Sequence, residues 1–121
     1  MVTRLVEDYR SGANRFDKLG EGLWEARDDG DLVGVCGLNL DPFAAAEERT
    51  GRVRRLYVLP EWRRLGIASE LVDLVEEQAE QRFAVLTAFT TDSGAAAFYR
   101  ARGYEPVVGV VKRSFQLRLD S

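Results

Sequence analysis

Two arginines and a glycine in the middle of the chain have the types and spacing to hold a diphosphate. Arg63, Arg64 and Gly66 stand just before a run with helical periodicity that begins at Ile67. The first N–H groups of a helix lack intrahelical partners, and the helix dipole adds partial positive charge there. Glycine also permits positive φ and a close backbone approach. We therefore predict an anion cradle at this turn; the alternative is a solvated basic turn that caps an ordinary helix.

The residues on either side of this turn predict the elements that position it. Residues 53–59 form a β-branched and aromatic run of strand length, and Pro60 removes the backbone donor that a central strand would need to continue. After the turn, apolar residues recur at spacings of three and four up to about residue 80, with acidic residues between them. This pattern predicts a strand that ends near Leu59 and an amphipathic helix with one buried face.

The first half of the chain predicts a β-hairpin. Strand-like runs at 23–27 and 32–40 are separated by a turn that contains Asp29-Gly30, and Asp-Gly favours a type I′ turn because both central positions need positive φ. Gly34 and Gly37 inside the second run indicate a bulge or close backbone packing. Residues 2–10 have helical spacing, and 41–51 predict a loop with a helical turn at 44–46.

The second half predicts a strand, a helix and a strand pair. Residues 83–90 are apolar nearly throughout, as in a strand that is covered on both faces. Residues 91–93 offer helix caps before an apolar run that Gly103 ends. The order strand, helix, strand and helix predicts parallel pairing of the two strands. Residues 104–108 and 110–119 predict two strands that pair across Gly109 or through a longer turn.

Two motifs resemble those of a known family. The run LYVLPEWRRLGIA resembles the acyl-coenzyme A signature of the GNAT superfamily of N-acetyltransferases, in which Arg or Gln, two residues, Gly, one residue, and Gly or Ala surround the pyrophosphate; Arg63, Gly66 and Ala68 match. Residues 92–104 are similar to the other GNAT signature, with Asp92 where many members have asparagine. The matching residues there are Ala95, Phe98, Tyr99, Gly103 and Tyr104.

The resemblance covers roughly residues 21–119 and implies a fold. It implies one GNAT-like domain over residues 1–121, of the α/β class with a mixed (α+β) central sheet flanked by helices. GNAT domains usually begin with a strand before their first helices, and no strand-like run precedes residues 2–10. We therefore expect a version that is trimmed at its N-terminus and lacks the first strand.

The resemblance also implies a function: transfer of an acetyl group from acetyl-CoA to a primary amine of a small molecule, peptide or protein, by direct attack in a ternary complex. The backbone of Leu56, Tyr57 and Val58 would hold the pantetheine arm, the Val58 N–H would stabilise the developing oxyanion, and Tyr99 would protonate the leaving sulfur. The other implied coenzyme contacts are Arg63, Arg64, Gly66, Ile67, Ala68, Asp92 and Ala95.

Several alternatives stay open. Tyr99 can instead be a packed aromatic residue, and the domain can instead be a non-catalytic acyl-CoA-binding or regulatory module, or an interaction subunit. The general base is undecided among four carboxylates. Arg52 and Arg54 share a strand face and either attract an acidic group of the acceptor or form a solvent-facing pair balanced by acidic neighbours. The four candidate carboxylates are Asp41, Glu47, Glu48 and Glu61, of which Glu47 and Glu48 are those neighbours.

Composition excludes several other classes. The net charge is −3 with 17 basic and 20 acidic residues, so no overall field favours nucleic acid. A single cysteine, Cys36, and the lack of histidine argue against a disulfide or a metal site, and Cys36 is expected to be a small buried hydrophobe. No run approaches membrane-spanning length. We expect a cytoplasmic protein, and a homodimer through an unpaired sheet edge is compatible with each hypothesis.

Overall fold

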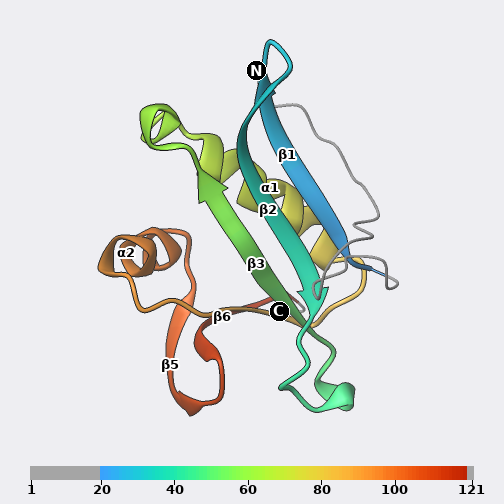
Figure 1. Ribbon diagram of the computed structural model, residues 1–121. Coiled ribbons are helices and arrows are strands. Elements are labelled where there is room, and N and C mark those ends of the chain that lie inside the picture. Colours follow the sequence, from blue (N-terminus) through green and yellow to red (C-terminus); the bar gives the residue numbers. More distant parts are fainter. Residues whose placement is uncertain (1–19, 120–121) are drawn as a thin grey trace.

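The computed structural model describes residues 20–119, which fold as one mixed sheet with two α-helices (Figure 1). The strands are β1 (Gly22–Asp28), β2 (Asp31–Leu40), β3 (Thr50–Val58), β4 (Val85–Ala88), β5 (Glu105–Val110) and β6 (Arg113–Arg118). Their order in the sheet is β1-β2-β3-β4-β6-β5. This confirms the GNAT-like mixed sheet expected from the motifs. The helix expected at 2–10 and the expected N-terminal trimming lie outside the described residues.

The first two strands form the predicted hairpin. β1 (Gly22–Asp28) and β2 (Asp31–Leu40) pair antiparallel. Asp29 and Gly30 have φ values of 50° and 85°, as a type I′ turn requires. Gly34 allows close packing, since a Cβ there would lie 3.3 Å from side-chain atoms of both Ile67 and Leu71. The glycine in this strand therefore lets helix α1 approach the sheet.

Strand β3 (Thr50–Val58) begins beside β4 and then leaves it. It pairs antiparallel with β2 along most of its length but pairs parallel with β4 (Val85–Ala88) only from Thr50 to Arg52. Its register with β2 shifts between Val35 and Gly37, and Arg55 on β3 has φ of 61°. Such a β-bulge bends a strand and increases its twist. In Figure 1 the far end of β3 points away from the second half of the sheet.

The second half of the sheet differs in detail from the expectations. β4 is four residues long rather than eight, although all four are buried as expected. β5 (Glu105–Val110) and β6 (Arg113–Arg118) are joined by a turn at positions 111 and 112, where Lys112 has φ of 55°. The turn is therefore not at Gly109, which lies within an irregular part of β5. The short helix η1 (Ala46–Glu48) falls two residues later than expected, and η2 (Pro60–Trp62) was not predicted.

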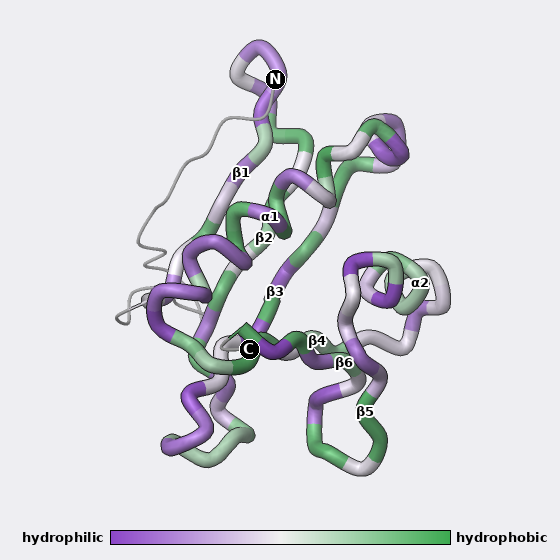
Figure 2. Tube along the Cα trace, turned by 180° about the vertical axis from the view of Figure 1, so that it is seen from behind, coloured by the Kyte–Doolittle hydropathy of each residue, from purple (hydrophilic) through white to green (hydrophobic). Residues whose placement is uncertain are grey.

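Both α-helices lie on one face of the sheet. α1 (Ile67–Ala79) packs against β1, β2 and β3, and its hydrophobic positions alternate with hydrophilic ones along the coil in Figure 2. Tyr99 of α2 (Ser93–Ala101) packs against Phe115 of β6. Phe115 pairs with Ala88 of β4, and this register places Phe115 on the same face of the sheet as α1. The core on this face includes five fully buried side chains that hold α1 on the sheet: Trp24, Leu38, Ile67, Leu71 and Leu86.

A charged cluster ties the two helices together. Arg102, just after α2, donates to Asp73 at 2.5 Å and to Glu76 at 3.0 Å on α1. The Tyr104 hydroxyl donates to the other Glu76 oxygen at 2.7 Å. Because Arg102 and Glu76 are mostly buried, this cluster fixes how α2 stands relative to α1. Within residues 20–119, no helix has the length and apolar character to cross a bilayer.

Candidate functional site

A cavity of about 680 Å³ lies where β3 has left β4. Its wall comes from the end of β3, the turn before α1, the first turn of α1 and the first half of α2. Ten of the eleven predicted site residues line it: Leu56, Tyr57, Val58, Arg63, Arg64, Gly66, Ile67, Ala68, Asp92 and Ala95. The eleventh, Tyr99, does not.

Four more residues line the cavity without having been predicted as site residues, namely Trp62, Ser69, Gly94 and Phe98. Ser69 completes the first turn of α1, and Phe98 lies one helical turn after Ala95. Helical spacing could have identified both. Trp62 belongs to the unpredicted η2 helix, so no periodicity pointed to it.

The N-terminus of α1 has no side-chain cap. Its N-cap is Gly66, with φ of 85°, and the first intrahelical bond runs from Glu70 N–H to the Gly66 carbonyl at 3.0 Å. The amides of Ile67, Ala68 and Ser69 precede that bond. By contrast, the Asp92 carboxylate caps α2 by accepting from the Ala95 N–H at 2.8 Å. The amides of α1 are thus available to an anion, as the cradle prediction requires.

Arg63 fixes the turn to the end of β3. Its Nε donates to the Val58 carbonyl at 2.8 Å, and its guanidinium carbon lies 5.3 Å from the centre of the Tyr57 ring. Arg64, with φ of 66°, follows in the left-handed region and is exposed. The two arginines bring positive charge to the same end of the cavity as the uncapped amides.

The peptide groups of Val58 point away from β2. The Leu59 N–H donates to the Val33 carbonyl at 2.9 Å, which makes Gly34 and Val58 a non-hydrogen-bonded pair of the antiparallel ladder. The N–H and carbonyl of Val58 therefore face the side that β4 has left, and its carbonyl meets Arg63 there. Pair types alternate along a ladder, so the peptide groups of Tyr57 face β2. Of these two predicted backbone contacts, Val58 is the one directed toward the cavity.

Tyr99 lies in the hydrophobic core, where it is 5% exposed. Its ring packs against Phe98, Tyr104 and Phe115 at centroid distances of 5.4, 5.1 and 5.9 Å. Burial raises the pKa of the Tyr99 phenol, and Cys36 adds to this shift while Arg102 opposes it. The hydroxyl consequently keeps its proton throughout the neutral range. Its role as a proton donor stays a prediction.

The four candidate bases lie outside the cavity wall. Glu48 bonds to Arg113 at 2.9 Å and to the Thr50 hydroxyl at 2.9 Å, and these bonds lower its pKa. Asp41 is buried, and both its oxygens accept hydrogen bonds. Glu48 is thus held by Arg113 and Thr50. The register with β2 confirms that Arg52 and Arg54 share a face.

Cys36 is fully buried on β2, as expected, and burial raises its pKa to about 12. The unfolded thiol has a pKa near 9, so above that pH the unfolded chain releases a proton that the folded chain retains. We expect the free energy of unfolding to fall as pH rises from 9 toward 12, as measured by urea denaturation. Cys36→Ala should reduce that slope; an unchanged slope would contradict a role for this thiol.

Among residues 20–119, no three His, Cys, Asp or Glu side chains converge as metal ligands.

Comparison with known proteins gives the same fold. Residues 3–104 match the acetyltransferase (GNAT) family. A candidate acetyltransferase from Exiguobacterium sp. 255-15 superposes with a TM-score of 0.76 at 28% identity, over 85% of this chain and 66% of that one. A GNAT-family acetyltransferase from Staphylococcus aureus Mu50 superposes with a TM-score of 0.68 at 23% identity, over 83% of this chain and 68% of that one. The PaiA N-acetyltransferase from Thermoplasma acidophilum, in complex with coenzyme A, superposes with a TM-score of 0.68 at 17% identity, over 81% of this chain and 60% of that one. The chain thus spans about two thirds of the length of these proteins.

Proposed function

The chain belongs to the acetyltransferase (GNAT) family, and we propose that it is an N-acetyltransferase that transfers an acetyl group from acetyl-CoA to a primary amine by direct attack in a ternary complex. The Thermoplasma relative binds coenzyme A, which supports an acyl-CoA donor here. The acceptor is a small molecule or an amine of a peptide or protein.

The uncapped N-terminus of α1 carries this proposal. Coenzyme A contains a diphosphate, and the amides of Ile67, Ala68 and Ser69 have no intrahelical acceptor. A Cβ on Gly66 would meet no atom within 4 Å, so the space beside this N-cap residue is open. Arg63 and Arg64 add charge at the same place. The residues present therefore fit an acyl-CoA.

The remaining steps use groups of β3 and α2. Acetyl-CoA supplies a thioester whose carbonyl an amine can attack. The Val58 N–H, directed toward the side vacated by β4, would donate to the oxygen as negative charge develops on it. Tyr99 would give its phenolic proton to the departing thiolate, and burial, which raises the pKa of Tyr99, makes this transfer less favourable than it is from an ordinary phenol. The proton that the attacking amine loses would pass to solvent, because Asp92, the one carboxylate on the described cavity wall, already caps α2.

A second candidate is a non-catalytic acyl-CoA-binding module. Two observations favour it: Tyr99 does not line the cavity, and none of the four carboxylates proposed as a base does so. Such a module would keep the cradle and show no turnover.

Calorimetric titration tests the shared part of both candidates. We expect acetyl-CoA and free CoA to bind in the micromolar range and pantetheine, which lacks the diphosphate, to bind at least about 100-fold more weakly, a difference near 2.7 kcal/mol. Release of free thiol on adding amines would then separate the enzyme from the module. No binding of acetyl-CoA or CoA would contradict both.

We also propose a reducing cytoplasmic setting and a homodimer. The free, buried Cys36 supports the first. The homodimer is supported by β5, an edge strand whose unpaired backbone groups can pair with another chain and whose Val108 side chain is exposed.

A further inference from the structure

The β5–β6 hairpin carries an apolar segment that is open to solvent. Residues 106–111 contain four valines and no charged residue. The exposed fractions of Val108, Val110 and Val111 are 94%, 43% and 64%. In Figure 2 the loop end of the hairpin, below α2, is mostly coloured as hydrophobic. Exposed apolar clusters at a sheet edge favour contact with another molecule.

The two edges of the sheet differ in what they expose. The edge strands are β1 and β5. All seven residues of β1 are buried or half-buried, whereas all but one of the six residues of β5 are exposed. The β5 edge is therefore the one that presents apolar side chains to a partner.

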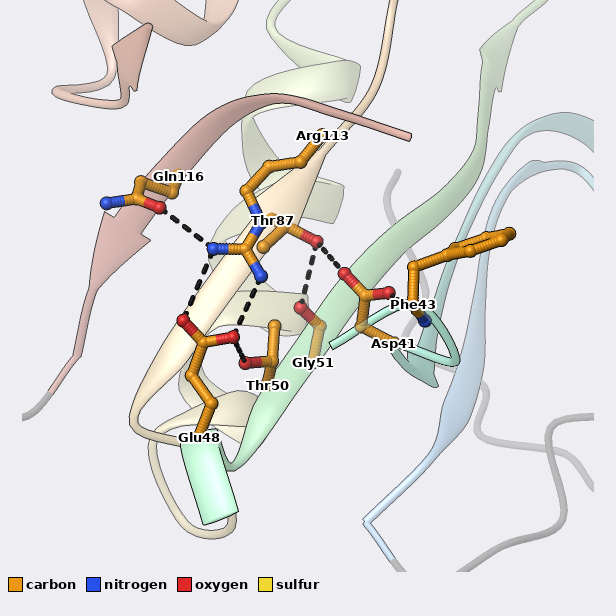
Figure 3. A network of polar contacts seen from close by, with 8 residues as sticks. All are labelled: Asp41, Phe43, Glu48, Thr50, Gly51, Thr87, Arg113 and Gln116. Carbon is orange, nitrogen blue, oxygen red and sulfur yellow. Dashed lines mark hydrogen bonds and ion pairs between the residues drawn. The ribbon is translucent and has the colours of Figure 1, made fainter. Parts of the chain in front are cut away.

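The hairpin is anchored at its β6 side. Arg113, the first residue of β6, donates to Glu48 at 2.9 Å and to Gln116 at 3.0 Å (Figure 3). Glu48 also accepts from the Thr50 hydroxyl at 2.9 Å. These bonds join the hairpin to η1 and to the start of β3. The valines are thus presented on a fixed support, which lowers the entropy cost of binding.

An acidic and a basic residue flank the apolar segment. Glu105 lies at the base of the hairpin and Lys112 in its turn, and both are exposed. Within residues 20–119 neither of them forms an ion pair. The Lys112 ammonium is held over the Phe89 ring, 5.1 Å from its centre. Both charges can therefore pair with a charged group of another molecule.

These two charges make the segment complementary to a second copy of itself. Val108 and Gly109 are the middle residues of 105–112, so a twofold axis beside them would place two such segments antiparallel. Glu105 of each copy would then lie across from Lys112 of the other. A partner of different sequence requires no such match between the two ends of one segment.

Building on the homodimer proposed above, we propose that two copies associate through residues 105–112 about this twofold axis. The valines pack against those of the other copy, and Glu105 of each copy pairs with Lys112 of the other. Pro106 lacks an N–H and β5 is irregular up to Val110, so backbone pairing is short and side chains provide most of the contact. Because the apolar segment is small, we expect a weak dimer with a Kd on the order of 10 µM.

Sedimentation velocity over a range of protein concentrations tests the apolar contact. Val108→Glu should raise the dimer Kd by at least about 100-fold, because the twofold axis repeats the buried charge in both copies. Leu32→Glu is the matched control. Leu32 is 42% exposed near the start of β2, so this variant adds the same charge away from the proposed contact and should leave the Kd unchanged.

Charge reversal tests the pairing of the two copies. Glu105→Lys and Lys112→Glu, each alone, should raise the Kd by about 10-fold, because like charges then face each other twice. The double variant should restore the wild-type Kd, and an equimolar mixture of the two single variants should form heterodimers, since opposite charges meet again in both cases. Glu80→Lys, at the exposed end of α1, changes the net charge as Glu105→Lys does and should have no effect.

Three results would overturn the proposal. A dimer that survives Val108→Glu uses another surface, and single charge variants that the double reversal does not restore contradict the pairing of Glu105 with Lys112. A wild type that stays monomeric up to about 500 µM contradicts the homodimer itself, and the hairpin then serves a different partner or none. Circular dichroism shows whether each variant is folded, and the charge variants test the proposal even if Val108→Glu is not.

These measurements use no coenzyme. Their outcome is therefore independent of the proposed acetyl-CoA binding, which calorimetry measures separately.

Discussion

Gly66→Glu is expected to weaken acetyl-CoA binding by at least about 100-fold without unfolding the domain. Gly66 is the N-cap of α1, and a side chain there would enter open space. A glutamate would place a carboxylate where the diphosphate is expected, so it would compete for the amides and repel the phosphates. Calorimetric titration with acetyl-CoA measures the loss.

The backbone strain of this substitution needs its own control. Gly66 has φ of 85°, and a non-glycine residue in the left-handed region costs roughly 1 kcal/mol. Gly30 has the same φ of 85° in the β1–β2 turn, and a Cβ there also meets no atom within 4 Å. Gly30→Glu should therefore show the same loss of stability in urea but normal coenzyme affinity. Normal affinity in Gly66→Glu, or equal loss in both variants, would refute the cradle.

Tyr99→Phe is expected to lower kcat by about 100-fold or more while leaving the Kd for acetyl-CoA unchanged. Phenylalanine keeps the ring that packs against Phe98, Tyr104 and Phe115, so the fold of α2 should persist. What is removed is the one proton that the proposed mechanism assigns to the departing thiolate. Steady-state kinetics together with calorimetry separate the two quantities.

The matched control is Tyr104→Phe. Its phenol is also buried, but it donates to Glu76 at 2.7 Å, so removing it should reduce stability and not kcat. Because burial raises the pKa of Tyr99, the wild-type rate should show no fall from its ionisation at or below pH 10. If Tyr99→Phe keeps full activity, Tyr99 is a packed aromatic residue and another group supplies the proton.

The amino-acid sequence predicts most of the helices and strands, and also the turn before α1, because these features depend on neighbouring residues. The Asp29-Gly30 turn, the start of α1 after Gly66 and the Asp92 cap of α2 all follow from backbone preferences within a few positions. The two motifs predicted the family, and residues of both motifs line one cavity. Boundaries were less accurate where packing decides them, as in the short β4.

Contacts between groups that lie far apart in the chain could not be predicted from the sequence and are seen in the folded molecule. Glu48 and Arg113 are 65 positions apart, yet they form an ion pair at 2.9 Å. β3 leaves β4 after Arg52, and the bulge at Arg55 lies between that point and Val58, whose peptide groups face the cavity. Tyr99 was matched by its motif, yet its burial depends in part on Phe115, which comes from the distant strand β6. Local preferences fix φ, ψ and periodicity, whereas ion pairs, strand divergence and burial arise when distant segments compete for the same space.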